Sequence, residues 1–316
     1  MKFGIGQPIK RKEDDKFLTG SGCYNDDINL KDQVYMHIVR SPYAFAKIIN
    51  INYEKAKKYP GVLAILSNQT IKNMNINPMY PGFKVMNKDG TEMIDTFRNI
   101  LADQKVRYVG EPVLAIIGQT NEIAEEVADL IDIEYEEMQS TTNLSDAIKH
   151  KAPTVREELS NNICFDWEYG DIEKAKYAIK NSKHVTLIEL VNNRLVPNPI
   201  ECRSSIGQYN LNSETYNLYC SSQGVHSLKK KLSNIFNIQE EKLNVFTPDV
   251  GGGFGMKIFN YPEYVLTLAA SKLTNKPVKW RAKRSESFLS DIHGRDHISS
   301  AKLGFDKNYK ITALMV

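Results

Sequence analysis

The sequence predicts an α+β fold, and three patterns support this prediction. A continuous apolar run at 113–117 is typical of a buried strand, and apolar residues at helical spacing follow it between 122 and 131. Further strand-like and helix-like segments are interspersed along the chain, with no internal repeat. A strand at 243–246 leads into a glycine loop at 251–255 and then into an apolar helix at 261–273. The length of 316 residues suggests about two domains.

The first part of the chain, residues 1–135, is expected to form one compact α+β unit. Residues up to about 20 are charged and interrupted by Gly and Pro, which favours an extended arm, and weak periodicity at 69–100 favours a long loop. Helices are expected at 53–59 and 122–131, the first ended by Pro60-Gly61. Strands are expected at 34–40, 48–51, 62–66, 113–117 and 133–135.

The second part, residues 136–316, begins with a connector that contains a short helix at 144–150. Asp171 is expected to cap a helix ending at 181, because an Asp side chain accepts hydrogen bonds from the first free amides of a helix. The last strand runs to the end of the sequence, so we expect it to need a partner. Strands are expected at 185–191, 204–209, 216–221, 243–246 and 278–281, helices at 224–236 and 261–273, and a hairpin over 300–316.

Composition argues against several classes of protein. The 41 basic residues nearly balance the 38 acidic ones, so no nucleic-acid partner is expected. The sequence has no run of about eighteen apolar residues and no apolar signal region, which predicts no membrane span and a cytoplasmic location. No metal-ligand cluster is evident, and His293 and His297 are weak candidates without a helical context. Free buried thiols are expected at Cys23, Cys164, Cys202 and Cys220.

The glycine loop Gly251-Gly252-Gly253-Phe254-Gly255 is the strongest candidate for a functional feature. Glycine permits positive φ and close approach of the backbone, and amides exposed in this way bind anions or polar cofactor edges. Neither phosphate-loop pattern fits, because Lys257 is displaced from the P-loop position and Met256 takes the sixth position of the dinucleotide pattern. A tight turn without a ligand is the alternative.

Two other segments carry polar residues that could belong to a site. Gln223 lies where an apolar strand ends and a helix begins, and a role in capping that helix is the simpler expectation. Glu201 and Arg203 follow Pro197 and Pro199 and are expected to pair with each other.

Together these segments resemble the molybdenum-containing subunit of the xanthine dehydrogenase, aldehyde oxidase and carbon monoxide dehydrogenase family. The landmarks occur in the family's order along nearly the whole chain. They are GQPIKRKEDDKFLTGSGCYNDDI at 6–28, VRSPYAFAKI at 39–48, VRYVGEPVLAII at 106–117, GDIEKA at 170–175, PIECRSSIGQY at 199–209, SSQ at 221–223, PDVGGGFGMK at 248–257, KPVKWRAKRSESF at 276–288 and GRDH at 294–297.

The resemblance implies a fold and a set of cofactor-binding residues. Residues 1–135 would form the family's α/β hammerhead domain, and residues 136–316 would form the first part of its molybdopterin-binding α+β domain. Gln223 would hydrogen-bond near an oxo ligand of molybdenum. Gly252, Gly253, Phe254 and Gly255 would line the pterin, with Phe254 also bounding the substrate channel. No metal ligand and no catalytic residue is expected within this chain.

One departure from the family bears on the substrate. Xanthine-oxidising members of the family that this chain resembles have a similar loop, in which a Glu directly follows the Lys. This chain has Ile258 at that position, so the resemblance disfavours a purine as the substrate. The loop followed by Tyr261-Pro262-Glu263-Tyr264 is more similar to carbon monoxide dehydrogenase and to archaeal aldehyde or glyceraldehyde oxidoreductases. The resemblance therefore implies hydroxylation of an aldehyde to a carboxylic acid. Carbon monoxide oxidation and a non-catalytic assembly module or relic remain alternatives.

The second departure is length, because the family's catalytic subunit is more than twice as long. The general-base Glu is expected outside this chain, and a second chain is expected to carry the C-terminal molybdopterin-binding half. The resemblance also implies molybdopterin in its cytosine dinucleotide form with molybdenum. An FAD-binding medium subunit and a small subunit with [2Fe-2S] clusters would complete the complex. A nucleotide-binding domain is a weaker alternative, since both phosphate patterns fail.

Overall fold

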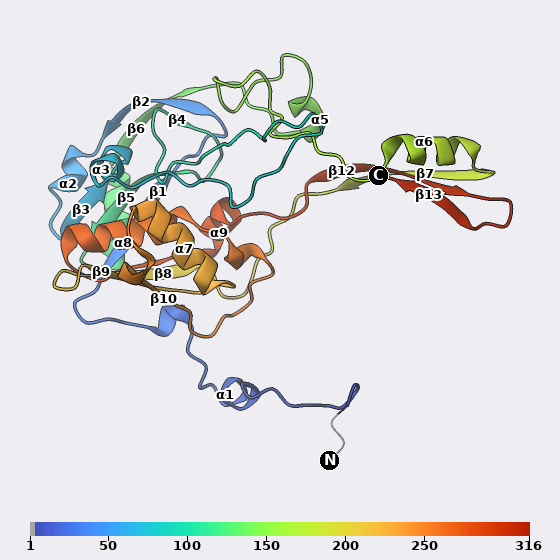
Figure 1. The fold of residues 1–316 in the computed structure, drawn as a ribbon. Helices are drawn as coiled ribbons and strands as arrows, with labels where there is room; N and C mark the ends of the chain where they lie inside the picture. The colour runs from blue at the N-terminus through green and yellow to red at the C-terminus, as the bar shows by residue number, and fades with distance from the viewer. Residues whose placement is uncertain (1–3) are drawn as a thin grey trace.

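A computed structural model describes residues 4–316, and a seven-stranded sheet organises most of them (Figure 1). Its strand order is β10-β9-β8-β11-β1-β5-β3, so three strands from the first part of the chain join four from the second. Two pairs, β1 with β11 and β9 with β10, are parallel, and the other pairs in this sheet are antiparallel. The predicted boundary near residue 135 stays a prediction.

The strands agree closely with those expected from the sequence, with β1, β3, β10 and β11 beginning and ending at the predicted residues. The strands are β1 (Val34–Arg40), β2 (Ala46–Asn52), β3 (Val62–Leu66), β4 (Lys105–Val106), β5 (Pro112–Gly118), β6 (Asp132–Glu137), β7 (His184–Asn192), β8 (Ser204–Asn210), β9 (Thr215–Cys220), β10 (Leu243–Phe246), β11 (Val278–Arg281), β12 (His297–Phe305) and β13 (Ile311–Met315).

The helices also follow the sequence, and Asp171 caps α6 as expected, accepting a hydrogen bond from the Lys174 amide at 2.9 Å. The α-helices are α1 (Asp14–Leu18), α2 (Glu54–Lys57), α3 (Asn68–Asn73), α4 (Asn121–Glu126), α5 (Leu144–Ala147), α6 (Ile172–Asn181), α7 (Val225–Phe236), α8 (Pro262–Thr274) and α9 (Arg284–Ser290). The 3-10 helices are η1 (Asn25–Asp27), η2 (Val127–Leu130), η3 (Glu240–Lys242) and η4 (Met256–Ile258).

Helix α8 lies in the main core. Every residue from Pro262 to Ser271 is buried, as expected for a helix that is apolar on all sides. It packs so closely on β8 that a Cβ at Gly207 would lie 2.4 Å from the backbone of Thr267, so only glycine fits there. Because only η4 and three further residues separate the glycine loop from α8, this packing limits where the loop can lie.

Two further sheets of three strands complete the fold. Strands β4, β2 and β6 form one of them, with β2 paired to both of the others. Strands β13, β12 and β7 form an arm that extends away from the main body and carries α6 (Figure 1). The arm includes the expected hairpin, and all nine residues of β7 are exposed.

Several expectations from the sequence are wrong in detail. The segment expected to be a loop at 69–100 begins with α3, because the Ser67 side chain caps it by accepting from the Thr70 amide. The arm expected at 1–20 contains α1, and its first three residues lie outside the described part. Helix α9 was not expected. All four thiols are free, but only Cys220 is buried, whereas Cys164 and Cys202 are half-buried and Cys23 is exposed, because the N-terminal segment lies outside the core.

Within the described residues 4–316, no helix is long and apolar enough to span a bilayer.

The carboxyl group of Glu111, in the segment leading into β5, is buried beside a cavity of about 540 Å³ that Arg98, Arg107 and Arg156 also line. Burial raises its pKa from 4.5 to about 7, although the amide and charge of Arg107 oppose that shift. The folded state therefore holds this proton more tightly than the unfolded state does.

We expect Glu111 to make the protein less stable as the pH rises from about 5 to 8. At about 1.4 kcal/mol per unit of pKa, ionising this buried carboxyl costs the folded state about 3 kcal/mol. Glu111→Gln should therefore gain about 2–3 kcal/mol relative to the parent between pH 5 and pH 8, measured by urea unfolding. A difference between the two proteins that does not change with pH would contradict this assignment.

Candidate functional site

The glycine loop lies between β10 and α8, as the sequence predicts, with the short helix η4 in between. Gly252 has φ +97° and Gly255 has φ +81°, values that L side chains rarely adopt. Phe254 also has a positive φ, of +50°. Glycine permits these values at 252 and 255, whereas Phe254 adopts a left-handed conformation that is strained for an aromatic residue.

Gln223 packs directly against the loop. A Cβ at Gly253 would lie 2.4 Å from Gln223 Cδ, so the glycine is what allows the amide side chain to lie there. The Lys257 amide donates to Gln223 Oε1 at 3.1 Å, and the Gln223 amide donates to the Lys257 carbonyl at 3.1 Å. The expectation that Gln223 caps the following helix is therefore wrong, because the loop takes its side-chain oxygen and Gly224 holds the N-cap position.

The backbone amides of the loop are largely free to bind something else. Within residues 4–316, the amides of Gly252, Gly253, Phe254 and Gly255 donate to no protein acceptor. Consecutive free amides in a turn with positive φ form a concave surface that attracts anionic or polar groups. Gly252 and Gly253 are half-buried and Phe254 and Gly255 are exposed, so the loop is accessible to a ligand from solvent.

Glu201 and Lys257 form an ion pair that the sequence did not reveal. Lys257 Nζ lies 2.7 Å from Glu201 Oε2, and the same oxygen accepts from the Gly251 amide at 2.8 Å. The expected pairing of Glu201 with Arg203 is wrong, because the two side chains point to different groups from the same segment. Lys257, placed six residues after the first loop glycine, was considered only as a displaced phosphate-loop lysine.

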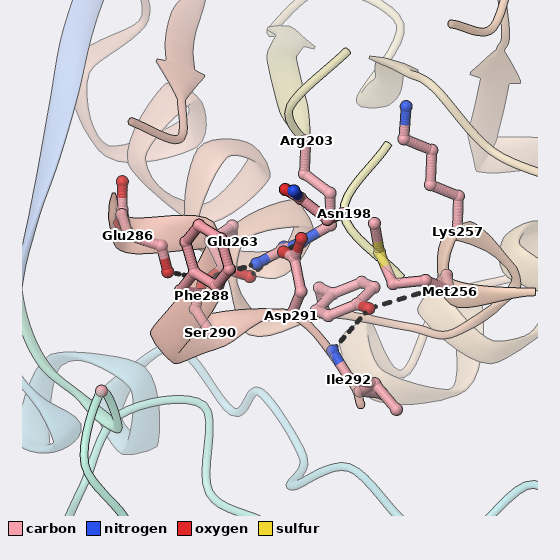
Figure 2. Close-up of polar contacts among 12 residues, drawn as sticks. Asn198, Arg203, Met256, Lys257, Glu263, Glu286, Phe288, Ser290, Asp291 and Ile292 are labelled. Carbon is pink, nitrogen blue, oxygen red and sulfur yellow. Dashed lines mark hydrogen bonds and ion pairs between the residues drawn. The ribbon is translucent and has the colours of Figure 1, made fainter. Parts of the chain in front are cut away.

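Arg203 instead lies at the centre of a buried ionic network (Figure 2). Its guanidinium contacts Glu263 at 2.8 Å and Asp291 at 2.6 Å. Arg40, at the end of β1, contacts Glu263 and Glu286 at 2.7 Å each, so the network joins the two parts of the chain. Burial alone would raise the pKa of Glu263, but the two arginines lower it to about 2.

The network also supports Tyr261, six residues after the end of the loop. The Arg203 guanidinium lies 3.7 Å from the centre of the Tyr261 ring. The Tyr261 hydroxyl donates to the Met256 carbonyl at 3.0 Å and accepts from the Ile292 amide at 3.1 Å (Figure 2). These contacts hold Met256, the residue after Gly255, in place, while the amides of residues 252–255 make no hydrogen bond to the protein within residues 4–316.

Around the loop, large apolar side chains are exposed. Phe254 is 72% exposed and Ile200 94%, and Ile258 follows the loop lysine at 47%. Two buried polar atoms nearby, Glu201 Oε1 and Ser221 Oγ, have no hydrogen-bond partner. Exposed large apolar side chains grouped around a loop are typical of a surface that another molecule or another part of a protein covers.

The structure brings together the five candidate residues, since Gly252, Gly253, Phe254 and Gly255 form the loop and Gln223 lies against it. His293 and His297 do not join a metal cluster, and no such cluster of His, Cys, Asp or Glu occurs within the described residues. His293 instead accepts a hydrogen bond from Arg194 at 2.8 Å.

Two family models match the chain. The model described as molybdopterin cofactor-binding domain matches residues 155–316. The model described as aldehyde oxidase and xanthine dehydrogenase, a/b hammerhead domain, matches residues 19–139.

Individual relatives are also similar to this chain over nearly its whole length. The carbon monoxide dehydrogenase large chain of Afipia carboxidovorans is 28% identical over 98% of this chain and 39% of its own length. The nicotine 6-hydroxylase large subunit of Paenarthrobacter nicotinovorans is 30% identical over 98% of this chain and 37% of its own. The crystal structure of quinoline 2-oxidoreductase from Pseudomonas putida 86 superposes with a TM-score of 0.87 at 27% identity, covering 99% of this chain and 39% of that one. The chain thus spans well under half the length of these relatives.

Proposed function

The chain belongs to the molybdenum-containing large-subunit family of xanthine dehydrogenase, aldehyde oxidase and carbon monoxide dehydrogenase, and from this premise we propose that its glycine loop and Gln223 form one wall of a molybdopterin site. The observation that carries the proposal is the close contact of Gly253 with Gln223 beside four free amides. Because relatives such as the carbon monoxide dehydrogenase large chain are oxidoreductase subunits, we propose that this chain is also part of an oxidoreductase.

The residues fit a large polar cofactor. The free amides of residues 252–255 can donate to the carbonyl, nitrogen and phosphate acceptors of molybdopterin. Gly252 lets the backbone pass close to the chain's own Phe254 ring, which a Cβ would approach to 2.9 Å, whereas a Cβ at Gly255 would meet nothing within 4 Å, so space is open at that end of the loop. These groups offer donors but no metal ligand, which suits a cofactor that brings its own metal.

Within this arrangement each residue has a distinct task. When bound, molybdopterin supplies the redox chemistry that oxidises the substrate. Gln223 keeps its amide NH2 as a hydrogen-bond donor toward the site, because its oxygen is already engaged by Lys257. The loop amides orient the pterin, and Phe254 covers its edge and narrows access for water and substrate. The general base is expected in the part of the subunit that this chain does not contain.

For the substrate we propose a small aldehyde, glyceraldehyde among the candidates. Ile258 supports this choice, since it places an apolar side chain where purine-oxidising members carry a carboxylate. Carbon monoxide is a second candidate, favoured by the relative from Afipia carboxidovorans. A non-catalytic module of the same fold is the third.

We also propose that the chain works within a larger assembly. The relatives are more than twice as long, so a further polypeptide segment carrying the C-terminal molybdopterin-binding half would close the site from the other side. FAD and [2Fe-2S] subunits would accept the electrons, and the cytosine dinucleotide form of the cofactor is expected. The proposed domain limits are 1–135 and 136–316.

The proposal predicts that the purified complex containing this chain holds about one molybdenum and one pterin per copy. Elemental analysis and fluorescence of the oxidised pterin measure both. A panel of aldehydes, carbon monoxide and aromatic heterocycles with an artificial electron acceptor then identifies the substrate. A fully assembled complex that contains neither molybdenum nor pterin would disprove the proposal and favour the non-catalytic module.

A further inference from the structure

The buried pair of Glu201 and Lys257 connects the two ends of the glycine loop. Glu201 Oε2 accepts from the amide of Gly251, the first loop residue, at 2.8 Å. The same oxygen accepts from Nζ of Lys257, two residues beyond the last loop residue, at 2.7 Å. The Glu201 amide also donates to the Gly251 carbonyl at 3.1 Å, so one residue holds the start of the loop through both its backbone and its side chain.

Burying this ion pair between two chain segments has a free-energy cost, because both charges lose contact with water. Lys257 is fully buried, and the Glu201 side chain is 11% exposed. Burial lowers the pKa of Lys257, and the contact with Glu201 only partly offsets that effect. A well-packed apolar pair of similar volume is often as stable as a buried ion pair, so stability alone does not require these two charges.

The two charged residues fix the directions of the backbone amides at the two ends of the loop. The carboxylate holds the Gly251 amide inward, and the lysine places its own amide on Gln223. Between these two anchors, the four free amides donate to no protein acceptor within residues 4–316, and the loop's own backbone contact runs from the Met256 amide to the Gly253 carbonyl at 2.9 Å. An apolar pair could fill the space but could not hold the Gly251 amide.

We propose that Glu201 and Lys257 act as a latch that holds the glycine loop in its cofactor-accepting form, and are therefore positioning residues for the bound molybdopterin. The inference rests on the proposed function, because it takes molybdopterin as the group that the loop receives. It adds two residues whose role is in cofactor retention rather than in contact with the reacting atoms.

The test separates retention of the cofactor from stability. The double variant Glu201→Met/Lys257→Met removes both charges and should unfold at a urea concentration close to that of the parent. Its molybdenum and pterin content in the purified complex should nevertheless fall at least about fivefold, because the Gly251 amide has lost its acceptor. Lys283→Met is the matched control, since it removes an exposed pair with Glu125 at 2.7 Å and should load normally. A double variant that loads molybdenum like the parent would overturn the latch.

A milder variant keeps the inference testable if the double variant does not fold. Glu201→Asp keeps the charge but withdraws the carboxylate by one methylene. Hydrogen exchange at the amides of Gly251 and Lys257 should then be at least about fivefold faster than in the parent, whether or not the cofactor is present. Unchanged exchange would contradict the latch. A parent complex without molybdenum would instead contradict the proposed function, while leaving the exchange result interpretable.

Discussion

Replacing Gly253 with alanine is expected to lower the molybdenum content of the complex by about tenfold or more. The added Cβ would lie 2.4 Å from Gln223 Cδ and 2.7 Å from both Gln223 Cγ and Oε1, so the whole Gln223 side chain must move. That movement breaks the hydrogen bond from the Lys257 amide and takes the Gln223 donor out of the proposed site. A tenfold loss corresponds to about 1.4 kcal/mol, within the range for one misplaced hydrogen-bonding group.

Gly294→Ala provides the matched control for this experiment. A Cβ at Gly294 meets nothing within 4 Å, and its φ is not in the left-handed region. The control should keep its molybdenum and pterin, and both variants should stay folded by circular dichroism. A Gly253→Ala complex with parental molybdenum content would mean that the cofactor does not depend on this contact.

Replacing Arg203 with methionine is expected to destabilise the protein by about 3–5 kcal/mol. Arg203 is fully buried, and among residues 4–316 its loss would leave Asp291 without a side-chain donor and Glu263 with Arg40 as its remaining side-chain donor. It also removes the cation from the face of the Tyr261 ring. Burial would lower the pKa of Arg203, but the surrounding carboxylates raise it, so the residue stays charged under ordinary conditions.

Urea unfolding of the parent and two comparison variants checks this value. Arg281→Met removes an exposed contact with Asp26 at 2.7 Å and should cost less than about 1 kcal/mol. Arg203→Lys should recover part of the loss, because lysine keeps the charge but cannot contact Glu263 and Asp291 together. If Arg203→Met lowers the free energy of unfolding by no more than Arg281→Met does, the buried network does not stabilise the fold as this account expects.

Much of the fold could be predicted from local patterns. The apolar run at 113–117 became the fully buried β5, and Asp171 capped α6, because both depend on residues close in sequence. The pairing of β1 with β11 could not be foreseen, since it joins residues more than 240 positions apart and leaves no local trace. Helix α3 was missed because its capping serine is followed by a segment rich in Asn.

The candidate site likewise has residues that local sequence patterns predict and contacts that those patterns do not predict. The glycines of the loop are conspicuous because their conformation demands glycine at those positions. The partners of Glu201, Lys257 and Arg203 were not predictable, because buried charges are matched by tertiary contacts rather than by spacing along the chain. The clue available in the sequence was the presence of charged residues within otherwise apolar segments, as with Glu263 at the start of α8.

The central claim is that the glycine loop and Gln223 form one wall of a molybdopterin site. A crystallographic or electron-microscopy map of the cofactor-loaded complex tests it most directly. The account predicts pterin density within hydrogen-bond distance of the amides of residues 252–255, with the molybdenum end directed toward the Gln223 amide. A map in which the cofactor is bound elsewhere, with this loop facing solvent or another subunit, would contradict it.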